Sequence, residues 1–387
     1  MKKILAALGI SLIIGLIYFF FFAAHQKDVS ENEVEKVDLS GISAEVRQFH
    51  QQLTIADLHS DNLLWDRNPL ERINHGHVDI PRLIEGNFSI QVFDAVIKVP
   101  FGENYFETRD SWDQITFLAM ANRWPLRTWG NLAERAVYQS QILHDAESRS
   151  EGRLQIIRTA GELQDFLTAR EHDPSKVSGI LSIEGLHALE GKIENLQRFY
   201  DAGYSIMGPV HFFDNELGGS SGGVRKGGIT DFGRQVIREM DRMKLIIDLA
   251  HASSTLILDV LQITERPVVV SHVGVQGIVD IPRNLNDAEL RAISDRGGLI
   301  GIGFWDDVVG GLSVEHIVRS IQYAVNIAGI DHVGLGSDFD GLTHIPFDAS
   351  QIVVLTDALL ESGFNREEVA KIMGGNQVRF LLENLPY

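Results

Sequence analysis

Short apolar runs alternate along this chain with stretches in which apolar residues recur at helical spacing. From about residue 43 onward, eight runs have the length and composition of buried strands: 54–59, 88–97, 179–184, 205–212, 244–251, 267–272, 298–304 and 332–338. Amphipathic segments between them predict helices at 194–203, 231–243, 254–263, 286–298 and 313–329. Strands that alternate with helices in this way favour a parallel sheet of the α/β class.

The number of strands indicates a barrel. Eight strands in roughly 340 residues favour a (β/α)8 TIM-type barrel over an open doubly wound sheet. The surplus length lies after the second strand, where apolar positions within 103–172 recur at helical spacing and predict a helical insertion. No internal repeat, low-complexity tract or proline-rich linker divides the rest. We therefore expect one globular domain over 43–387.

The first 42 residues follow a different pattern. Lys2 and Lys3 precede an uncharged apolar run over 4–24, close to the ~20 residues that a helix needs to cross a bilayer. This run is longer than the apolar core of a cleaved signal, roughly 7–15 residues. We expect an uncleaved signal anchor over 1–24, with a cleaved signal as the alternative and a buried core helix as the least favoured reading. A polar tether follows over 25–42, and the two lysines predict an exported domain.

Composition narrows the chemistry. The 34 basic and 53 acidic residues give a formal net charge of −19, which argues against nucleic acid as a partner. Cysteine is absent, so disulfides, thiolate ligands, a cysteine nucleophile and an acylated cysteine are excluded. Any metal ion must then be held by histidine, aspartate and glutamate.

The carboxyl ends of the predicted strands carry the informative polar residues. Six imidazoles and carboxylates lie at or just beyond these ends: His59, Glu184, His211, His251, His272 and Asp338. In a barrel these ends converge on one face, where active sites are built. Asp57, His59 and Asp61 also share one face of the first strand, because alternate residues point the same way. We therefore expect one joint site.

The residue types favour a metal site. Imidazoles and carboxylates without thiolates suit a catalytic Zn²⁺ or a similar divalent ion. At least three histidines and three carboxylates exceed the needs of one metal and fit two metals that share a bridging carboxylate. A serine triad is the rival interpretation, but the chain has no G-x-S-x-G elbow. The glycine-rich segment 218–228 matches no phosphate-binding fingerprint and is expected to be a mobile loop beside the site.

The remaining histidines carry no such signal. His332 begins a strand, at the opposite end of the barrel, and His187, three residues after Glu184, is a candidate supporting residue behind the ligands. The others lie in the tether, in helices or in loops and are expected to face solvent or to bond locally: His25, His50, His75, His77, His144, His172, His316 and His344.

Six ordered segments resemble the signature segments of the membrane (renal-type) dipeptidases, which are binuclear zinc peptidases on a barrel of the amidohydrolase kind. They are DLHSDNLLW (57–65), LSIEG (181–185), IIDLAHAS (246–253), VVVSHVG (268–274), PRNLNDAELRAI (282–293) and VGLGSDFDG (333–341). The similarity runs from about residue 50 to residue 383. FFDNELGGSSGG after His211 is similar to a bacterial branch of the family, and the N-terminal anchor replaces the C-terminal lipid anchor of the mammalian enzymes.

The resemblance implies metal-binding roles for five of these residues. His59 and Asp61 resemble the ligands of the first zinc, and His251 and His272 resemble those of the second. Glu184 resembles the carboxylate that bridges both ions, while Asp57 of the same segment is left as a structural or supporting carboxylate.

The resemblance also implies substrate-binding and catalytic roles. His211 matches the histidine that steadies the substrate carbonyl oxygen as it becomes an oxyanion. Arg283 matches the arginine that grips the free carboxylate of the substrate, for which a guanidinium fork is well shaped. Asp338 matches the acid/base aspartate, which also contacts the substrate. Together with the bridging Glu184, His211 and Asp338 form the expected catalytic set.

The implied function is hydrolysis of dipeptides by a metallodipeptidase. A metal-bridging hydroxide attacks the scissile carbonyl, and Asp338 passes a proton to the leaving amine. The alternative is a related amidohydrolase that acts on N-acyl amino acids or lactams. Arg283 distinguishes the two functions, since a substrate without a carboxylate does not need this arginine. A metal-loaded binding protein is the non-enzymatic alternative. The expected partners are two Zn²⁺ ions, dipeptides and the membrane, with a homodimer left open.

Overall fold

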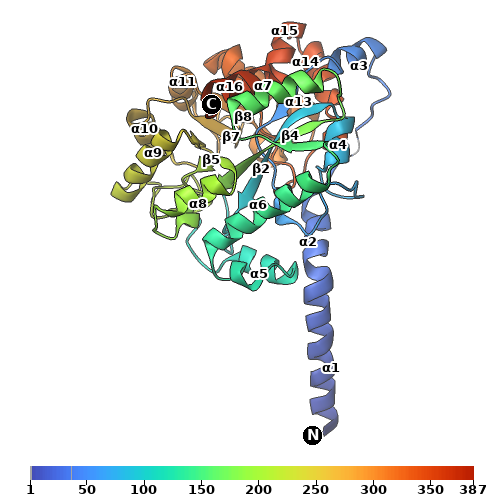
Figure 1. Ribbon diagram of the computed structural model, residues 1–387, viewed down its shortest axis with the longest axis vertical. Helices are drawn as coiled ribbons and strands as arrows, with labels where there is room; N and C mark the ends of the chain where they lie inside the picture. Colours follow the sequence, from blue (N-terminus) through green and yellow to red (C-terminus); the bar gives the residue numbers. More distant parts are fainter. Residues whose placement is uncertain (1, 36) are drawn as a thin grey trace.

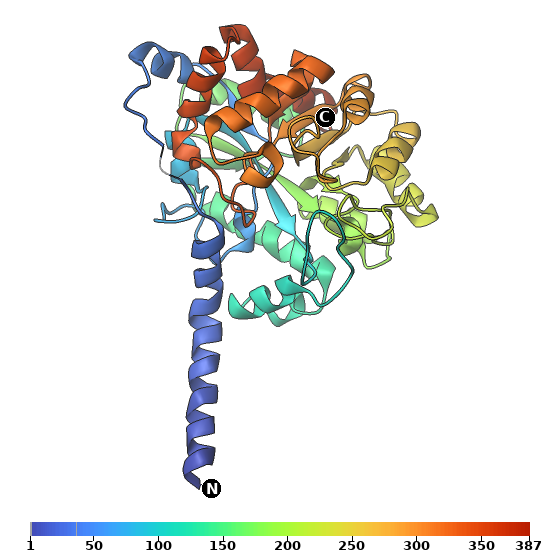
Figure 2. The same ribbon diagram turned by 180° about the vertical axis from the view of Figure 1, so that it is seen from behind.

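The computed structural model describes residues 2–35 and 37–387 (Figures 1 and 2). Residues 1 and 36, within the predicted anchor and tether, lie outside the described residues. Nine strands form one sheet: β1 (Ile55–Asp57), β2 (Phe88–Val96), β3 (Leu154–Ile156), β4 (Val177–Glu184), β5 (Tyr204–Gly208), β6 (Ile246–Ile247), β7 (Val269–Val273), β8 (Leu299–Ile302) and β9 (Val333–Leu335).

Eight of these strands follow one another around a barrel in chain order. The hydrogen-bonded order is β6-β5-β4-β2-β1-β9-β8-β7, and every pair is parallel. A parallel bridge between Asp248, directly after β6, and Val269 of β7 connects the two ends of this order. β3 pairs with the first residues of β4, off this circuit. The predicted (β/α)8 barrel is confirmed.

Helices join the strands and surround the sheet (Figure 1). They are α3 (Ala44–His50), α4 (Ile80–Glu85), α5 (Gln114–Ala121), α6 (Leu132–Arg149), α7 (Ala160–Arg170), α8 (Asn195–Asp201), α9 (Asp231–Met243), α10 (Ser254–Ile263), α11 (Asp287–Ser294), α12 (Asp306–Val309), α13 (Val314–Ala328), α14 (Val353–Glu361), α15 (Arg366–Ala370) and α16 (Asn376–Asn384). The side chain of Asn286 caps α11 by accepting from the backbone N–H groups of Ala288 and Glu289.

The insertion between β2 and β4 departs from the prediction at one place. The segment 103–172, expected to be helical, contains α5, α6 and α7, but Leu154–Ile156 forms β3. Leu154 and Ile156 are buried and Gln155 is exposed, as the alternation of a strand requires. Three residues are too few to show this period against the helical pattern around them, so the prediction was wrong there.

The N-terminal helix leaves the barrel and points away from it (Figures 1 and 2). It runs through α1 (Lys2–Tyr18), a π-helical turn η1 (Phe19–Ala23) and α2 (Ala24–Glu31). Among the described residues, Lys3–Glu31 is the one helix long and apolar enough to cross a membrane. The helix therefore continues into the segment expected as a polar tether, and beyond it Val34 pairs in parallel with Ile345 of the barrel.

Alternation along β4 places polar residues above an apolar layer. Ile180 and Glu184 point to the same side of the strand, because alternate residues of a strand share a face. Ile180 belongs to a buried cluster with Ile90, Ile206 and Leu299 of three other strands. Glu184 therefore lies at the carboxyl end of β4, on the same face whose earlier residue Ile180 packs in the apolar cluster.

Candidate metal centre

The carboxyl ends of the strands bring the predicted site residues together. His59 and Asp61 follow β1, Glu184 ends β4, His211 follows β5, His251 follows β6, His272 lies in β7 and Asp338 follows β9. Each of these residues is at most 8% exposed. They form one buried polar cluster, here called the metal centre.

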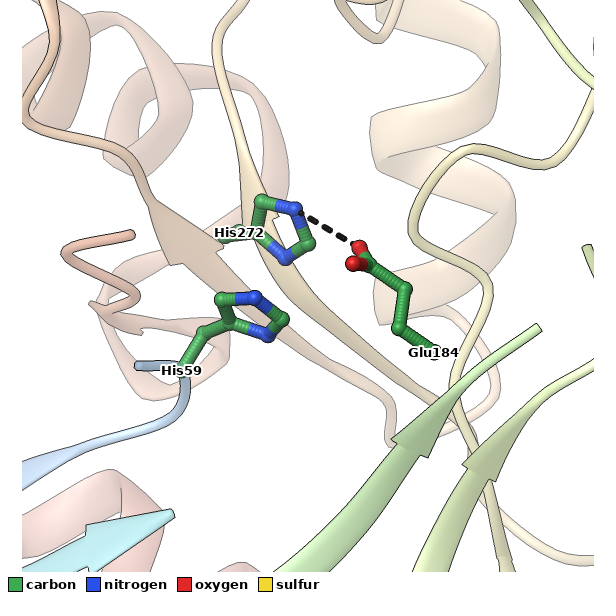
Figure 3. A group of neighbouring side chains, drawn as sticks. All are labelled: His59, Glu184 and His272. Atoms are coloured by element: carbon green, nitrogen blue, oxygen red, sulfur yellow. Dashed lines mark ion pairs between the residues drawn. The ribbon is translucent and has the colours of Figure 1, made fainter. Parts of the chain in front are cut away.

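The carboxylate of Glu184 lies among the imidazoles. Its Oε1 is 2.8 Å from His251 Nε2 and 3.3 Å from His272 Nε2, and its Oε2 is 3.0 Å from His211 Nε2. Figure 3 shows the rings of His59 and His272 side by side, with His272 directed at Glu184. The centroids of these two rings are 3.7 Å apart.

His59, Asp61 and Asp338 form the other side of the centre. His59 Nε2 is 3.4 Å from Asp61 Oδ1 and 3.8 Å from Asp338 Oδ1. Three ligand sets have donor atoms within 4.8 Å of one another: His59, Glu184 and His272; Glu184, His211 and His251; and His59, Asp61 and Asp338. Because Glu184 and His59 each belong to two sets, the three sets form one continuous centre.

The donor atoms of this centre fit a cation. Three buried acceptor atoms, His59 Nε2, Asp61 Oδ1 and Glu184 Oε1, have no hydrogen-bond partner among the described residues. The Nε2 atoms of His251 and His272 are 3.1 Å apart, and both face Glu184 Oε1. Imidazole and carboxylate lone pairs that converge in a buried space are costly unless a cation lies between them. The side chains present therefore fit divalent metal ions.

Burial controls protonation in the centre. Burial raises the pKa of Glu184 well above its ordinary value and raises the pKa of Asp338 to about 7. Burial also lowers the pKa values of His251 and His272 well below the usual range of imidazole. Neutral imidazoles are the form that binds metal, and a cation that enters would displace the protons that the acids hold.

A cavity of about 430 Å³ opens beside the metal centre. Its wall includes Arg283, Tyr105 and Trp305 as well as Glu184 and Asp338. Arg283 is buried, and its Nη2 donates to the backbone oxygen of His272 at 2.7 Å. The Nε of this guanidinium has no partner among the described residues. A cavity of this size suits a small ligand, and Arg283 offers that ligand a positive charge.

Asp94 is a site residue that the sequence analysis did not single out. It lies near the end of β2, its Oδ2 is 3.5 Å from His59 Nδ1, and it accepts from Ser182 Oγ. Burial raises its pKa to about 7. A carboxylate behind an imidazole orients the ring and sets its tautomer. One acid inside the apolar run 88–97 was the available signal, because a buried carboxylate requires a partner.

Two further predicted residues lie outside the ligand sets. The carboxylate of Asp57 accepts from the backbone N–H and the hydroxyl of Ser337, each at 2.7 Å, as expected for a structural carboxylate. His187 is buried, neither ring nitrogen has a partner among the described residues, and its ring lies 5.0 Å from that of Phe213. The glycine-rich segment does lie beside the site, since Ser221 N–H donates to the backbone oxygen of His251 at 2.7 Å.

Two histidines differ from the expectation of solvent exposure or local bonding. His50 is buried, and its Nδ1 is 2.8 Å from Thr356 Oγ1. His77 is also buried, and its Nδ1 accepts from the backbone N–H of Asp340 at 2.9 Å. The prediction was wrong for these two because their partners are distant in the sequence, where residue spacing carries no signal.

A parallel (β/α)8 barrel with buried imidazoles and carboxylates at its strand ends defines a metal-dependent hydrolase. The family model for Membrane dipeptidase (Peptidase family M19) matches residues 43–384, and the chain belongs to this family. The family predicted from the six segments is confirmed, while the bacterial branch stays a prediction.

Relatives support this assignment over most of the chain. Dipeptidase aclJ of Aspergillus oryzae is 26% identical over 402 aligned positions, which cover 97% of this chain and 88% of that protein. The crystal structure of dipeptidase AC, a metallo peptidase of family M19, has a TM-score of 0.72 at 26% identity and covers 87% of this chain and 100% of its own.

A metallo peptidase from Rhodobacter sphaeroides was solved with a phosphinate mimic of the dipeptide L-Ala-D-Ala. It has a TM-score of 0.69 at 26% identity, with 86% of this chain and 99% of that chain covered. Family and relatives together identify a dipeptide-hydrolysing metallopeptidase, whose substrates are small peptides and whose chemistry depends on metal ions.

Proposed function

We propose that this protein is a binuclear zinc dipeptidase in which Glu184 bridges the two ions. The observation that carries the proposal is the shared position of Glu184 in two of the three ligand sets. His59 and Asp61, which occur together in one set, would hold the first ion. His251 and His272, whose Nε2 atoms both face Glu184 Oε1, would hold the second.

The roles of the other side chains follow from their positions. When bound, two zinc ions would supply Lewis acidity, which acidifies a water molecule and polarises the scissile carbonyl. His211 lines the cavity beside Glu184 and would donate to the carbonyl oxygen of the substrate as negative charge develops there. Asp338 lines the same cavity, its Oδ1 is 3.8 Å from His59 Nε2, and it would take up a proton and deliver it to the leaving amine.

Arg283 would bind the free carboxylate of the dipeptide. A guanidinium can bind a carboxylate through two parallel N–H donors, which a lysine cannot do. Purified zinc-loaded protein should therefore cleave dipeptides much faster than dipeptide amides. Arg283→Lys should lower kcat/KM for free dipeptides by about 10–100-fold, the scale of one charge-assisted hydrogen bond. Equal cleavage of amides and free acids would contradict this role of Arg283 and would favour the alternative amidohydrolase acting on substrates without a carboxylate, such as lactams.

Metal analysis tests the number of ions. Removal of metal with a strong chelator should abolish hydrolysis, and zinc or another divalent ion should restore it. Elemental analysis of the fully active protein should give two metals per chain. A fully active chain with substantially fewer than two would contradict the bridged pair.

We also propose that α1 remains attached as an anchor and that the barrel lies on the exported side of the membrane. Lys2 and Lys3 before the apolar run 4–24 support this orientation. A reporter that is active only outside the cytoplasm, fused after residue 41, should give signal in the membrane fraction. A soluble mature chain that begins near residue 25 would instead establish a cleaved signal.

A further inference from the structure

The insertion between β2 and β4 exposes a cluster of large apolar side chains. Beyond Glu31, eight large apolar side chains are exposed among the described residues. Five of them lie in one stretch of 26 residues, 101–126, between β2 and β4. These five form the apolar patch: Phe101, Phe106, Trp112, Phe117 and Leu126. Trp112 and Leu126 are 78% and 75% exposed. Such a concentration marks a contact surface, because single exposed apolar residues are normally scattered.

Phe101 and Phe117 of the patch lie beside the upper end of the N-terminal helix. In Figures 1 and 2, α5 lies at the edge of the barrel where this helix departs. Phe19 and Ala23 of η1 line an apolar cavity of about 260 Å³ together with Phe101 and with Phe117 and Leu118 on the α5 side. The rings of Phe101 and Phe117 are 5.8 Å apart. The insertion and the helix therefore share an apolar boundary.

The contact with η1 sets the depth of the insertion relative to a bilayer. The 21 residues from 4 to 24 form a helix of about 31 Å, which matches a hydrocarbon thickness of about 30 Å. Phe19–Ala23 is the last part of this span, so it lies next to the membrane surface. A segment that packs against η1 then lies in the interfacial region, where tryptophan and other aromatic side chains are favoured.

We propose that the apolar patch inserts into the interface of the bilayer that α1 crosses, so that the barrel contacts the membrane at a second place. The proposal rests on the anchoring proposed above, which supplies the membrane. The position of Arg123 agrees with this depth in the bilayer, because its guanidinium lies 5.1 Å from the ring centre of Phe21, near the end of the apolar run.

The membrane contact lies directly behind the active-site wall. Leu64, Val99, Ile115 and Leu342 line both the apolar cavity and the cavity of the metal centre. One layer of side chains therefore separates the proposed bilayer contact from the catalytic cavity. Insertion of the patch would hold this wall in place and would orient the catalytic end of the barrel toward the membrane surface.

Depth-dependent fluorescence quenching tests the proposal on the full chain in lipid nanodiscs. The chain has no cysteine, so Trp112→Cys and Leu126→Cys each provide a single site for a fluorescent label. Leu258→Cys and Tyr387→Cys are matched controls, because both residues are exposed away from the patch, Leu258 on α10 and Tyr387 at the C-terminus (Figure 1). Leu12→Cys reports the anchor itself.

The expected result is a graded pattern of quenching. Lipids with a nitroxide near the headgroup should quench the labels at Trp112 and Leu126 more than lipids with a nitroxide deep in the chain, and the controls should stay unquenched. If Leu12 is quenched by the deep nitroxide while Trp112 and Leu126 behave like the controls, the patch proposal is overturned and the anchor stands. If Leu12 is unquenched as well, anchoring fails, and the patch proposal fails with it.

Discussion

Two buried polar clusters in this protein both combine histidines with carboxylates and differ in how their charges are balanced. The metal centre holds His59, Asp61, Glu184, His251 and His272, and several of its atoms lack partners among the described residues. The second cluster, here called the clamp, consists of Asp28, Arg67, His77 and Asp340. No buried side-chain atom of the clamp lacks a hydrogen-bond partner.

Arg67 accounts for the difference, because it pairs with both Asp28 and Asp340. Burial by itself would raise the pKa of Asp28, but hydrogen bonds with His75 and Arg67 and the charge of Arg67 lower it to about 2. Burial raises the pKa of Asp338 to about 7. A network built for structure contains its own countercharge, whereas a network built to bind a cation leaves that charge to the ligand.

The clamp also changes the interpretation of the segment that follows the apolar helix. The side chain of Asn32 accepts from the backbone N–H of Leu342 at 2.8 Å, and Val34 pairs with Ile345. Both contacts hold the loop that contains Asp338 and Asp340. These residues are two positions apart in the sequence, but Asp338 belongs to the metal centre and Asp340 belongs to the clamp. Residues expected to form a tether are therefore part of the folded unit.

The largest expected effect comes from the bridging position. Glu184→Gln keeps the shape of the side chain but removes the negative charge that both ions would share. We expect loss of measurable dipeptide hydrolysis and reduced occupancy of both metal sites, measured by elemental analysis. Two retained metals per chain together with normal activity would contradict the bridging role.

Asp338→Asn should separate proton transfer from metal binding. Asparagine is nearly isosteric with aspartate but cannot deliver or take up a proton. We expect normal folding and metal content with kcat lower by roughly 10²–10⁴-fold, the scale of general acid–base help. KM should change much less, provided that it reports binding. Near-normal kcat in a fully metallated variant would show that another group transfers the proton.

Arg67→Met should open the clamp without touching the metal centre. Removal of this guanidinium leaves two buried carboxylates unpaired, which should lower the free energy of unfolding by about 3–5 kcal/mol in denaturant titrations. Added zinc should not restore that loss. Arg72→Met is the matched control, because Arg72 pairs with Glu85 at the exposed surface and should cost no more than about 1 kcal/mol. Equal losses in the two variants would refute a special role for the clamp.

The smallest expected effect is the response to acid, and it has opposite signs in the two clusters. The pKa of Asp28 is lowered from 3.8 to about 2, so its contribution of about 2 kcal/mol is present above pH 3.8 and is lost as the pH falls through 2. The pKa of Asp338 is raised to about 7, so its own contribution to the stability of metal-free protein is present below pH 3.8 and is lost as the pH rises through 7.

Unfolding of metal-free protein between pH 2 and pH 8 measures both slopes. Asp28→Asn should weaken the acid limb, and Asp338→Asn should weaken the loss toward neutral pH, to which Asp94 and Glu184 also contribute because burial raises their pKa values. Identical profiles for the two variants would mean that the clusters do not differ in charge balance.

Local spacing predicted most of the fold. The predicted helices 231–243 and 254–263 coincide with α9 and α10, because apolar periodicity and capping residues lie within each segment. β3 was not predicted because a strand of three residues is too short to show the two-residue alternation of buried and exposed positions. Most strands are also shorter than predicted, although β4 is longer; β6 spans only Ile246–Ile247, since the chain turns away before His251.

The positions of the candidate ligands were also predictable from the sequence, because every parallel strand of a barrel ends on the same face. His59, Glu184, His251 and His272 meet there as expected. Asp94 was missed because its function depends on the approach of His59 from another strand. The catalytic and metal-binding roles of these site residues remain predictions until the variants above are measured.

The sequence by itself determined which polar residues stand at strand ends, because strand period and chain order are local properties. Only the tertiary structure decided which buried acids receive a countercharge from the protein. Arg67 joins Asp28, 39 residues away, to Asp340, 273 residues away. No local pattern encodes such a pairing, since it arises when packing of the barrel removes these side chains from water and forces them to find partners.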